Sequence, residues 1–162
     1  MTVGFYAGSF DPFTNGHLEV VKKACQIFDV VIIGIGTHPS KSRRFNKDEM
    51  LKAIEQVMVR EWLDEKVKVV MYSGLTTDCA AKFNTTHLVR GIRNGIDYQY
   101  EENIASVNQE ISGLDTMYFR AGDLGNVSSS MVMELLNNGH DVSKYLPKEV
   151  LDVVNKTKYE ET

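Results

Sequence analysis

Short apolar runs alternate with longer amphipathic runs along almost the whole of this chain. Residues 30–35 are β-branched and nearly uninterrupted, as expected of a strand that is buried on both faces. Residues 17–28 instead carry apolar side chains three and four positions apart, which is the pattern of a helix that buries one stripe. Because parallel strands are joined by crossover helices, the alternation predicts an α/β fold: a doubly wound five-stranded parallel sheet with helices on both faces.

The same patterns place the individual elements. Strands are expected at residues 3–7, 30–35, 67–71, 87–89 and 116–119. Helices are expected at 17–28, after a capping box formed by Asn46 and Glu49, at 77–83, 98–111 and 128–138, and after Pro147. The 162 residues fit one domain over 1–162, with residues 156–162 as a tail that can fray.

The bulk composition narrows the classes of function. The net charge of −4 and the sequence pI of about 5.6 argue against a general nucleic-acid binder, which usually has a basic excess. No apolar run approaches the ~20 residues that span a bilayer, and no signal peptide is recognisable, so we expect a cytoplasmic protein without a membrane partner. Cys25 and Cys79 have no CxxC partner and are expected to be buried thiols.

The most specific stretch is GSFDPFTNGH, residues 8–17, which follows the first strand and enters the first helix. Gly8 permits a tight turn, and Pro12 fixes one backbone angle within it. His17 falls in the first helical turn, where free N–H groups and the helix dipole favour an anion. There a histidine can donate a hydrogen bond to a phosphate oxygen whose charge grows in the transition state. The string is neither a Walker A loop nor a G-x-G-x-x-G motif, so it predicts a different phosphate-binding turn.

Residues 8–17 resemble the G-[ST]-F-D-P-x-T-x-G-H signature of bacterial phosphopantetheine adenylyltransferases, a family of the nucleotidylyltransferase superfamily. The resemblance covers nearly the whole chain and recurs in PSK (residues 39–41), SGLTTD (73–78), RGIR with DYQYE (90–93, 97–101) and VSSS (127–130). It implies an enzyme that transfers AMP from ATP to 4′-phosphopantetheine, giving dephospho-coenzyme A and pyrophosphate. The acceptor phosphate would attack the α-phosphorus in line, without a covalent enzyme intermediate.

The resemblance also implies roles for individual residues. His17 would stabilise the α-phosphoryl oxygens in the transition state, while Lys41 and Arg90 would hold the acceptor phosphate. Phosphopantetheine would be bound by Ser9, Lys41, Leu75, Thr76 and Arg90. ATP would be bound by Ser9, Phe10, His17, Gly91, Ile92, Arg93, Glu101, Leu124, Gly125, Asn126, Val127, Ser128, Ser129 and Ser130. Mg²⁺ would coordinate ATP phosphate oxygens and water, with no protein ligands, and the chain would assemble as a homohexamer.

Three positions or segments depart from the family pattern or bear on the choice of acceptor. Thr76 replaces the usual apolar residue along the pantetheine arm, and residues 120–126 replace a segment that usually reads M-P-S with an aromatic residue. Thr14 stands where relatives that use nicotinate mononucleotide or CTP usually have the first histidine of H-x-G-H. Two alternatives stay open: a related nucleotidylyltransferase with another phosphorylated acceptor, and a non-catalytic nucleotide-binding protein on the same scaffold.

Overall fold

The computed structural model describes residues 1–122 and 127–160 of the chain. The strands are β1 (Val3–Gly8), β2 (Val30–Gly36), β3 (Val67–Tyr72), β4 (His87–Ile92) and β5 (Asp115–Arg120). The helices are α1 (Asn15–Ile27), α2 (Lys47–Arg60), α3 (Thr76–Ala81), α4 (Gly95–Ser112), α5 (Ser129–Asn137) and α6 (Lys148–Glu160), with a 3₁₀ turn η2 (Ser143–Tyr145). Each strand and helix predicted from the sequence is present at or within a few residues of its expected place.

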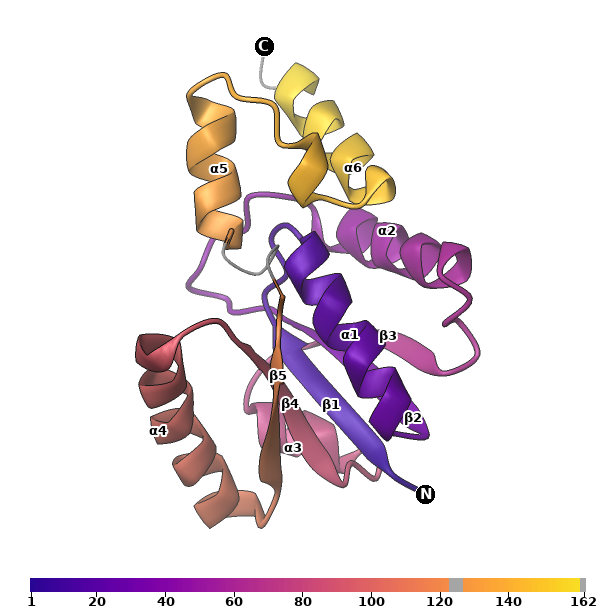
Figure 1. Cartoon of the computed structure of the whole chain (residues 1–162), viewed down its shortest axis with the longest axis vertical. Coiled ribbons are helices and arrows are strands. Elements are labelled where there is room, and N and C mark those ends of the chain that lie inside the picture. Colours follow the sequence, from indigo (N-terminus) through magenta and orange to yellow (C-terminus); the bar gives the residue numbers. More distant parts are fainter. Residues whose placement is uncertain (123–126, 161–162) are drawn as a thin grey trace.

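All five strands are parallel, in the order β3-β2-β1-β4-β5 (Figure 1). The chain therefore winds outward from β1 to β3, returns across the sheet, and winds outward again through β4 and β5. This confirms the predicted doubly wound parallel sheet. The direction of winding reverses between β1 and β4, and in open α/β sheets ligands bind beyond the carboxyl ends of the strands at that point.

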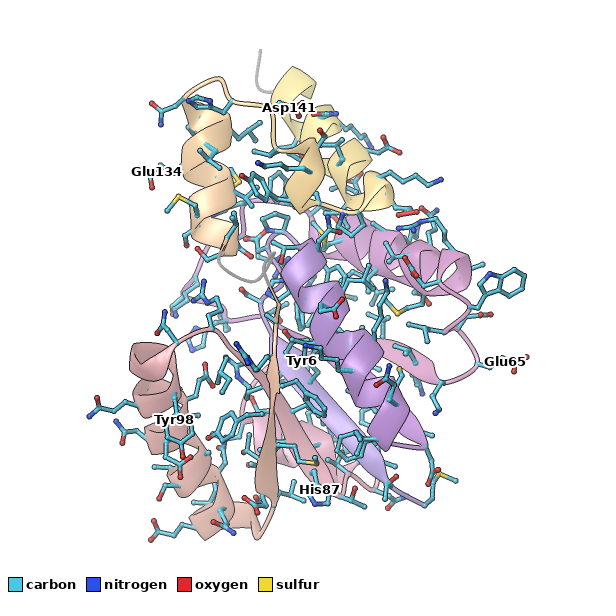
Figure 2. The ribbon with its side chains drawn as sticks, viewed as in Figure 1. Tyr6, Glu65, His87, Tyr98, Glu134 and Asp141 are labelled. Atoms are coloured by element: carbon cyan, nitrogen blue, oxygen red, sulfur yellow. The ribbon has the colours of Figure 1, made fainter. Side chains whose placement is uncertain are left out.

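The two faces of the sheet bury different cores. On one face, Tyr6, Ile33 and Val89 pack against α1 and α2 in a cluster that also includes side chains of α5 and α6. On the other face, Phe5 and Leu88 belong to a smaller cluster with α3. Figure 2 shows Tyr6 inside the fold beneath α1, whereas Glu65 and Glu134 project from the surface. The larger core supports α1, which begins directly after the turn of residues 8–14.

Helices α5 and α6 lie beyond the carboxyl ends of the strands, where α6 packs against α2 (Figure 1). Arg60 binds Glu149 across this contact, and Lys156 donates to Glu49 at 2.7 Å. Asn46 caps α2 as expected, accepting from the N–H groups of Asp48 and Glu49. The carboxylate of Glu49 binds Lys156 of α6, so the capping-box role predicted for it is replaced by a tertiary contact. Residues 156–160, expected in a tail that can fray, are helical.

The expectation for the two cysteines is also met. Cys25 and Cys79 are both free and buried, and burial raises the pKa of the Cys25 thiol to about 11. Among the described residues, no helix combines the length and the apolar character that crossing a bilayer would require.

Candidate active site

A cavity of about 360 Å³ opens at the carboxyl ends of β1 and β4, where the winding reverses. The start of α1 and the start of α5 close two of its sides, and Figure 1 shows these two helix ends near one another beyond the sheet. The lining residues are Tyr6, Ala7, Gly8, Ser9, Phe10, Thr14, Gly16, His17, Val20, Arg90, Gly91, Arg93, Tyr100, Glu101, Ala121, Val127, Ser128 and Ser129. Parts of the chain that are far apart in sequence therefore meet at the predicted place.

His17 lines the cavity with its ring orientation fixed by the start of α1. Thr14 is the N-cap of this helix, and its hydroxyl accepts from the backbone N–H of His17 at 3.2 Å. In return, the backbone N–H of Thr14 donates to Nδ1 of His17 at 2.9 Å. Because Nδ1 accepts a hydrogen bond from an amide, it carries no proton, and the neutral ring holds its proton on Nε2. His17 is thus a pre-set Nε2–H donor.

The surroundings of His17 also keep the ring uncharged. Its ring packs against Tyr6, Phe10 and Phe13, with centroids 6.3, 5.0 and 5.5 Å away. Burial, with smaller contributions from Arg90 and Arg93, lowers the pKa of His17 to about 3. The imidazole is therefore neutral at physiological pH. A neutral donor can bind an anionic oxygen while its tautomer stays fixed by Thr14.

The turn before α1 is held by the loop that follows β2. The buried carboxylate of Asp11 accepts the backbone N–H groups of Arg44 and Phe45 at 2.7 and 3.0 Å. Arg43 donates to the carbonyl oxygen of Ser9 at 2.7 Å. These contacts fix the turn from outside the cavity. Sequence analysis did not identify this clamp, although an aspartate in the motif and an arginine pair after the second strand are its visible signal.

Arg90, in the second half of β4, is bound by a carboxylate from α4. Its Nε and Nη2 donate to the two oxygens of Glu101 at 2.7 and 2.8 Å, and its Nη1 donates to the carbonyl oxygen of Ala7. Glu101 is buried, with 8% of its surface exposed. A guanidinium has five N–H donors, so two of them remain for a ligand. The expected nucleotide contact, Glu101, is therefore first a partner of the expected acceptor-phosphate residue, Arg90.

Three serines begin α5 at the cavity edge. Ser128 caps the helix by accepting from Met131 N–H at 3.1 Å, and the Ser129 hydroxyl donates to the Pro12 carbonyl at 2.8 Å. The Ser130 hydroxyl accepts from Arg44 at 3.3 Å. By helix geometry, the N–H groups of Ser129 and Ser130 have no acceptor within α5. These two N–H groups lie at the helix start that the resemblance assigns to ATP.

A second, smaller cavity of about 110 Å³ lies on the α3 and α4 side of the sheet. Arg90 and Glu101 line both cavities, so their ion pair forms part of the boundary between the two. The other lining residues are mostly apolar: Phe5, Ala7, Thr76, Leu88, Val89, Ile104, Ala105, Asn108 and Thr116. The predicted residue Thr76 belongs here, with its hydroxyl hydrogen-bonded to Tyr72 at 2.7 Å.

The structure brings most of the predicted residues together. Ser9, Phe10, His17, Arg90, Gly91, Arg93, Glu101, Val127, Ser128 and Ser129 all line the larger cavity. Lys41, Leu75, Ile92 and Ser130 lie outside its lining; Lys41 and Ser130 are exposed, Leu75 is 59% exposed, and Ile92 lines a neighbouring depression with Arg93. Leu124, Gly125 and Asn126 fall outside the described residues. Sequence analysis did not identify Tyr6, Tyr100 or Ala121 as lining residues.

Comparisons with known proteins identify the family of this chain. A family model described as cytidylyltransferase-like matches residues 5–135. The phosphopantetheine adenylyltransferase of Porphyromonas gingivalis is 40% identical over 147 residues, covering 90% of this chain and 94% of that protein. The enzyme of the same name from Lachnoclostridium phytofermentans is 38% identical over 156 residues, covering 95% and 94%.

A solved structure extends the comparison to the fold. A bifunctional NMN adenylyltransferase/ADP ribose pyrophosphatase from Francisella tularensis aligns with a TM-score of 0.66 and 16% identity, over 98% of this chain and 54% of that one. At this identity the likeness shows a shared fold.

Proposed function

This chain belongs to the phosphopantetheine adenylyltransferase family, and we infer that the cavity around His17 is its catalytic centre. The reaction transfers AMP from ATP to 4′-phosphopantetheine, giving dephospho-coenzyme A and pyrophosphate in coenzyme A biosynthesis. The observation that carries the assignment of the centre is the fixed neutral tautomer of His17. It places one N–H donor, already oriented, at the phosphate-binding end of α1.

The proposed chemistry is a direct in-line displacement. An oxygen of the acceptor phosphate attacks the α-phosphorus of ATP, and the bond from that phosphorus to the bridging oxygen of pyrophosphate breaks. Charge grows on the α-phosphoryl oxygens, where Nε2–H of His17 donates. No residue forms a covalent bond with substrate, so catalysis consists of positioning and charge stabilisation.

The remaining residues divide between the two substrates. For ATP, the start of α5 supports a grip on the β- and γ-phosphates through Ser128, Ser129 and Ser130, because its free N–H groups and dipole favour an anion. Around the nucleotide we assign Ser9, Phe10, Gly91, Ile92, Arg93, Glu101 and Val127, with Leu124, Gly125 and Asn126 carried from the family resemblance alone. For the acceptor phosphate we assign Arg90, whose two remaining donors suit phosphate, and Lys41.

The second cavity supports a place for the pantetheine arm. It adjoins Arg90, so a phosphate held there would leave the arm next to Thr76 and the apolar lining contributed by β1, β4 and α4. Leu75, exposed in the loop before α3, would cover the arm from outside. The amides of the arm need polar partners, which Asn108 and the Thr76 hydroxyl can provide.

A divalent cation accompanies the nucleotide in this proposal. The described residues hold no group of three His, Cys, Asp or Glu side chains suited to a metal ion. Following the family resemblance, we assign Mg²⁺ to ATP phosphate oxygens and water, with no protein ligand, and no step above depends on its position. Such coordination matches the preference of Mg²⁺ for phosphate and water oxygens.

We further propose that the enzyme works in the cytoplasm as a homohexamer. Helix α4 supports self-association, because its exposed apolar side chains Tyr100, Ile104, Val107 and Ile111 recur four, three and four residues apart on one stripe. A stripe of this kind is usually covered by another surface. Light scattering at assay concentrations measures the assembly directly, and a molar mass near the 18.3 kDa of one chain contradicts the proposal.

A pyrophosphate-release panel tests the function. ATP or CTP is offered with 4′-phosphopantetheine, nicotinate mononucleotide or glycerol 3-phosphate, and we expect turnover with ATP and 4′-phosphopantetheine. Turnover confined to another pair would assign a related nucleotidylyltransferase. Binding of ATP without turnover on any acceptor would assign a non-catalytic protein on this scaffold.

A further inference from the structure

Arg44 occupies an unusual place at the rim of the active site. Its backbone N–H is held by the buried carboxylate of Asp11 at 2.7 Å, which ties the residue to the phosphate-binding turn. Its exposed side chain then reaches across to the start of α5, where Nη2 donates to the hydroxyl of Ser130 at 3.3 Å. Nη1 donates to the carbonyl oxygen of Asp11 at 3.0 Å. The guanidinium therefore joins the turn before α1 to the helix start assigned to the β- and γ-phosphates.

The surroundings of the Arg44 charge differ from those of the other two arginines of the site, Arg43 and Arg90. The contacts of the Arg44 guanidinium are a carbonyl and a hydroxyl, and among the side chains that the structure describes no carboxylate lies within ion-pair distance of it. Arg43, one residue earlier, lies 3.6 Å from a carboxylate oxygen of Asp11, and Arg90 is bound by Glu101. Arg44 is thus the arginine of the three whose charge remains available for a ligand.

The position of this charge is unfavourable without an anion. The N-terminus of a helix carries a partial positive charge, so a cation beside it is repelled. Arg44 is nevertheless held there by its hydrogen bonds to Ser130 and Asp11. An anion placed between the guanidinium and the first N–H groups of α5 would be attracted by both. The arrangement is therefore electrostatically complementary to a polyphosphate.

We propose that Arg44 is a binding residue for the leaving pyrophosphate, contacting the β- and γ-phosphates of ATP together with the start of α5. Three of its N–H donors remain after the two contacts described, which is enough for a bidentate phosphate interaction. As the bond to the α-phosphorus breaks, pyrophosphate departs with the electron pair and gains negative charge. Arg44 stabilises that charge, so it contributes to the forward step and to pyrophosphate binding in the reverse step. This role rests on the proposed function, since it assumes that ATP lies in the His17 cavity.

The test compares ligands that have the leaving group with one that lacks it. Arg44→Gln is expected to raise the Kd of Mg²⁺–ATP, measured by calorimetry, and the KM of pyrophosphate in the reverse reaction by about 10- to 100-fold. Dephospho-coenzyme A shares adenosine and the α-phosphate with ATP but has no pyrophosphate leaving group, so its Kd should stay within about twofold of the wild-type value. Arg44→Lys, which keeps the charge without the planar fork, should show an intermediate loss.

Lys47→Gln is the matched control, because it removes one positive charge from an exposed residue at the start of α2. It should leave all three constants unchanged. Equal weakening of ATP and dephospho-coenzyme A by Arg44→Gln would assign a purely structural clamp and overturn the proposal, as would unchanged ATP and pyrophosphate constants. Should Arg44→Gln fail to fold, Arg44→Lys alone decides by the same ligand contrast.

Failure of the proposed function would be visible separately. In that case the wild-type protein itself would make no dephospho-coenzyme A from ATP and 4′-phosphopantetheine. Arg44 would then be judged by the binding of ATP against AMP alone. Equal effects of Arg44→Gln on these two nucleotides would overturn its role whatever the acceptor.

Discussion

Two sides of the proposed active site, the lining of the His17 cavity and the loops outside that lining, differ in how far the protein fixes their geometry without a ligand. On the fixed side, His17 is oriented by Thr14 and packed among aromatic rings, and Arg90 is held by Glu101 and Ala7. On the open side, the loops after β2 and β3 carry Lys41 and Leu75, which are both exposed. Within the described chain, the side chain of Lys41 makes no hydrogen bond or ion pair.

The difference indicates that the fixed side stabilises the transition state, whereas the open side captures substrate. A group that stabilises the transition state is most effective when its orientation costs nothing at the moment of reaction. A group that captures a substrate can be ordered by the substrate itself, at some cost in affinity. Substitutions on the fixed side should therefore act mainly on kcat, and substitutions on the open side mainly on KM.

The sharpest test is His17→Asn. The asparagine side chain can place its oxygen near the position of Nδ1 and still accept from Thr14 N–H, but it has no donor at the position of Nε2. We expect kcat to fall by about 100-fold or more, the scale of losing one transition-state donor, while the melting temperature stays close to wild type. Pyrophosphate release and thermal unfolding measure the two quantities.

His17→Gln and His17→Ala complete the comparison. The glutamine amide can reach the Nε2 position, so His17→Gln should recover part of the rate lost in His17→Asn. His17→Ala should lose both the rate and the cap contact, with a lower melting temperature. Full activity in His17→Asn would remove His17 from the catalytic role.

Glu101→Gln tests whether Arg90 belongs to the fixed side. The amide is nearly the same size as the carboxylate, but it cannot accept both arginine N–H groups with a full negative charge. Because partners that orient a ligand-binding side chain typically contribute 10- to 100-fold, we expect kcat/KM for 4′-phosphopantetheine to fall by about tenfold or more, with kcat lowered.

The neighbouring Glu102→Gln is the control for this change. Glu102 is exposed and accepts from the Tyr118 hydroxyl at 2.7 Å, away from Arg90. A loss in Glu101→Gln no larger than the loss in Glu102→Gln would show that the Arg90–Glu101 pair does not position the acceptor phosphate.

Lys41→Gln tests the open side. Lys41 is exposed in the loop between β2 and α2, so its loss should leave the fold unchanged and weaken capture of the acceptor phosphate. We expect the KM for 4′-phosphopantetheine to rise by roughly 3- to 10-fold, the modest effect of one exposed charged contact, with kcat nearly constant. Lys52→Gln on α2 removes an exposed charge of the same kind and serves as the control. A kcat loss as large as that of His17→Asn would break the division between the two sides.

Much of this architecture was predictable from local sequence patterns. The spacing of apolar side chains predicts a buried strand at residues 30–35 and a helix with one apolar face at residues 17–28. Both patterns depend only on residues that are close in sequence. The turn at residues 8–14 and the start of α1 after it were also predictable, because their residues are contiguous. The family resemblance supplied roles for distant residues such as Arg90, and the structure brings ten of the assigned residues to one cavity.

The clamps around that turn could not be predicted in the same way. Asp11 binds Arg44, which is 33 residues away in sequence, and Glu101 binds Arg90, which is 11 residues away. Arg44 in turn donates to Ser130, 86 residues further along the chain. Such pairings follow from the strand order, which sequence spacing alone does not specify. In sequence, Arg43 and Arg44 are simply two adjacent basic residues. In the structure, Arg43 binds the turn, whereas the charge of Arg44 is available for a ligand.

The smallest expected effect is the absence of a titration. The pKa of His17 is lowered to about 3 by burial and the nearby arginines, whereas in the unfolded chain it would titrate near 6.5. The unfolded state therefore binds more protons between these values, so the contribution of His17 to folding stability is fully present above about pH 6.5 and is lost as pH falls toward 3.

In the folded protein the ring should remain the neutral Nε2–H tautomer from pH 8 down to about pH 5. Nitrogen-15 NMR of the imidazole, with the signal assigned by its disappearance in His17→Asn, measures both the charge and the tautomer. A His17 signal that titrates near pH 6.5, or that shows the proton on Nδ1, would mean that this side is not fixed before substrate binds, and the kcat loss of His17→Asn would then need another cause.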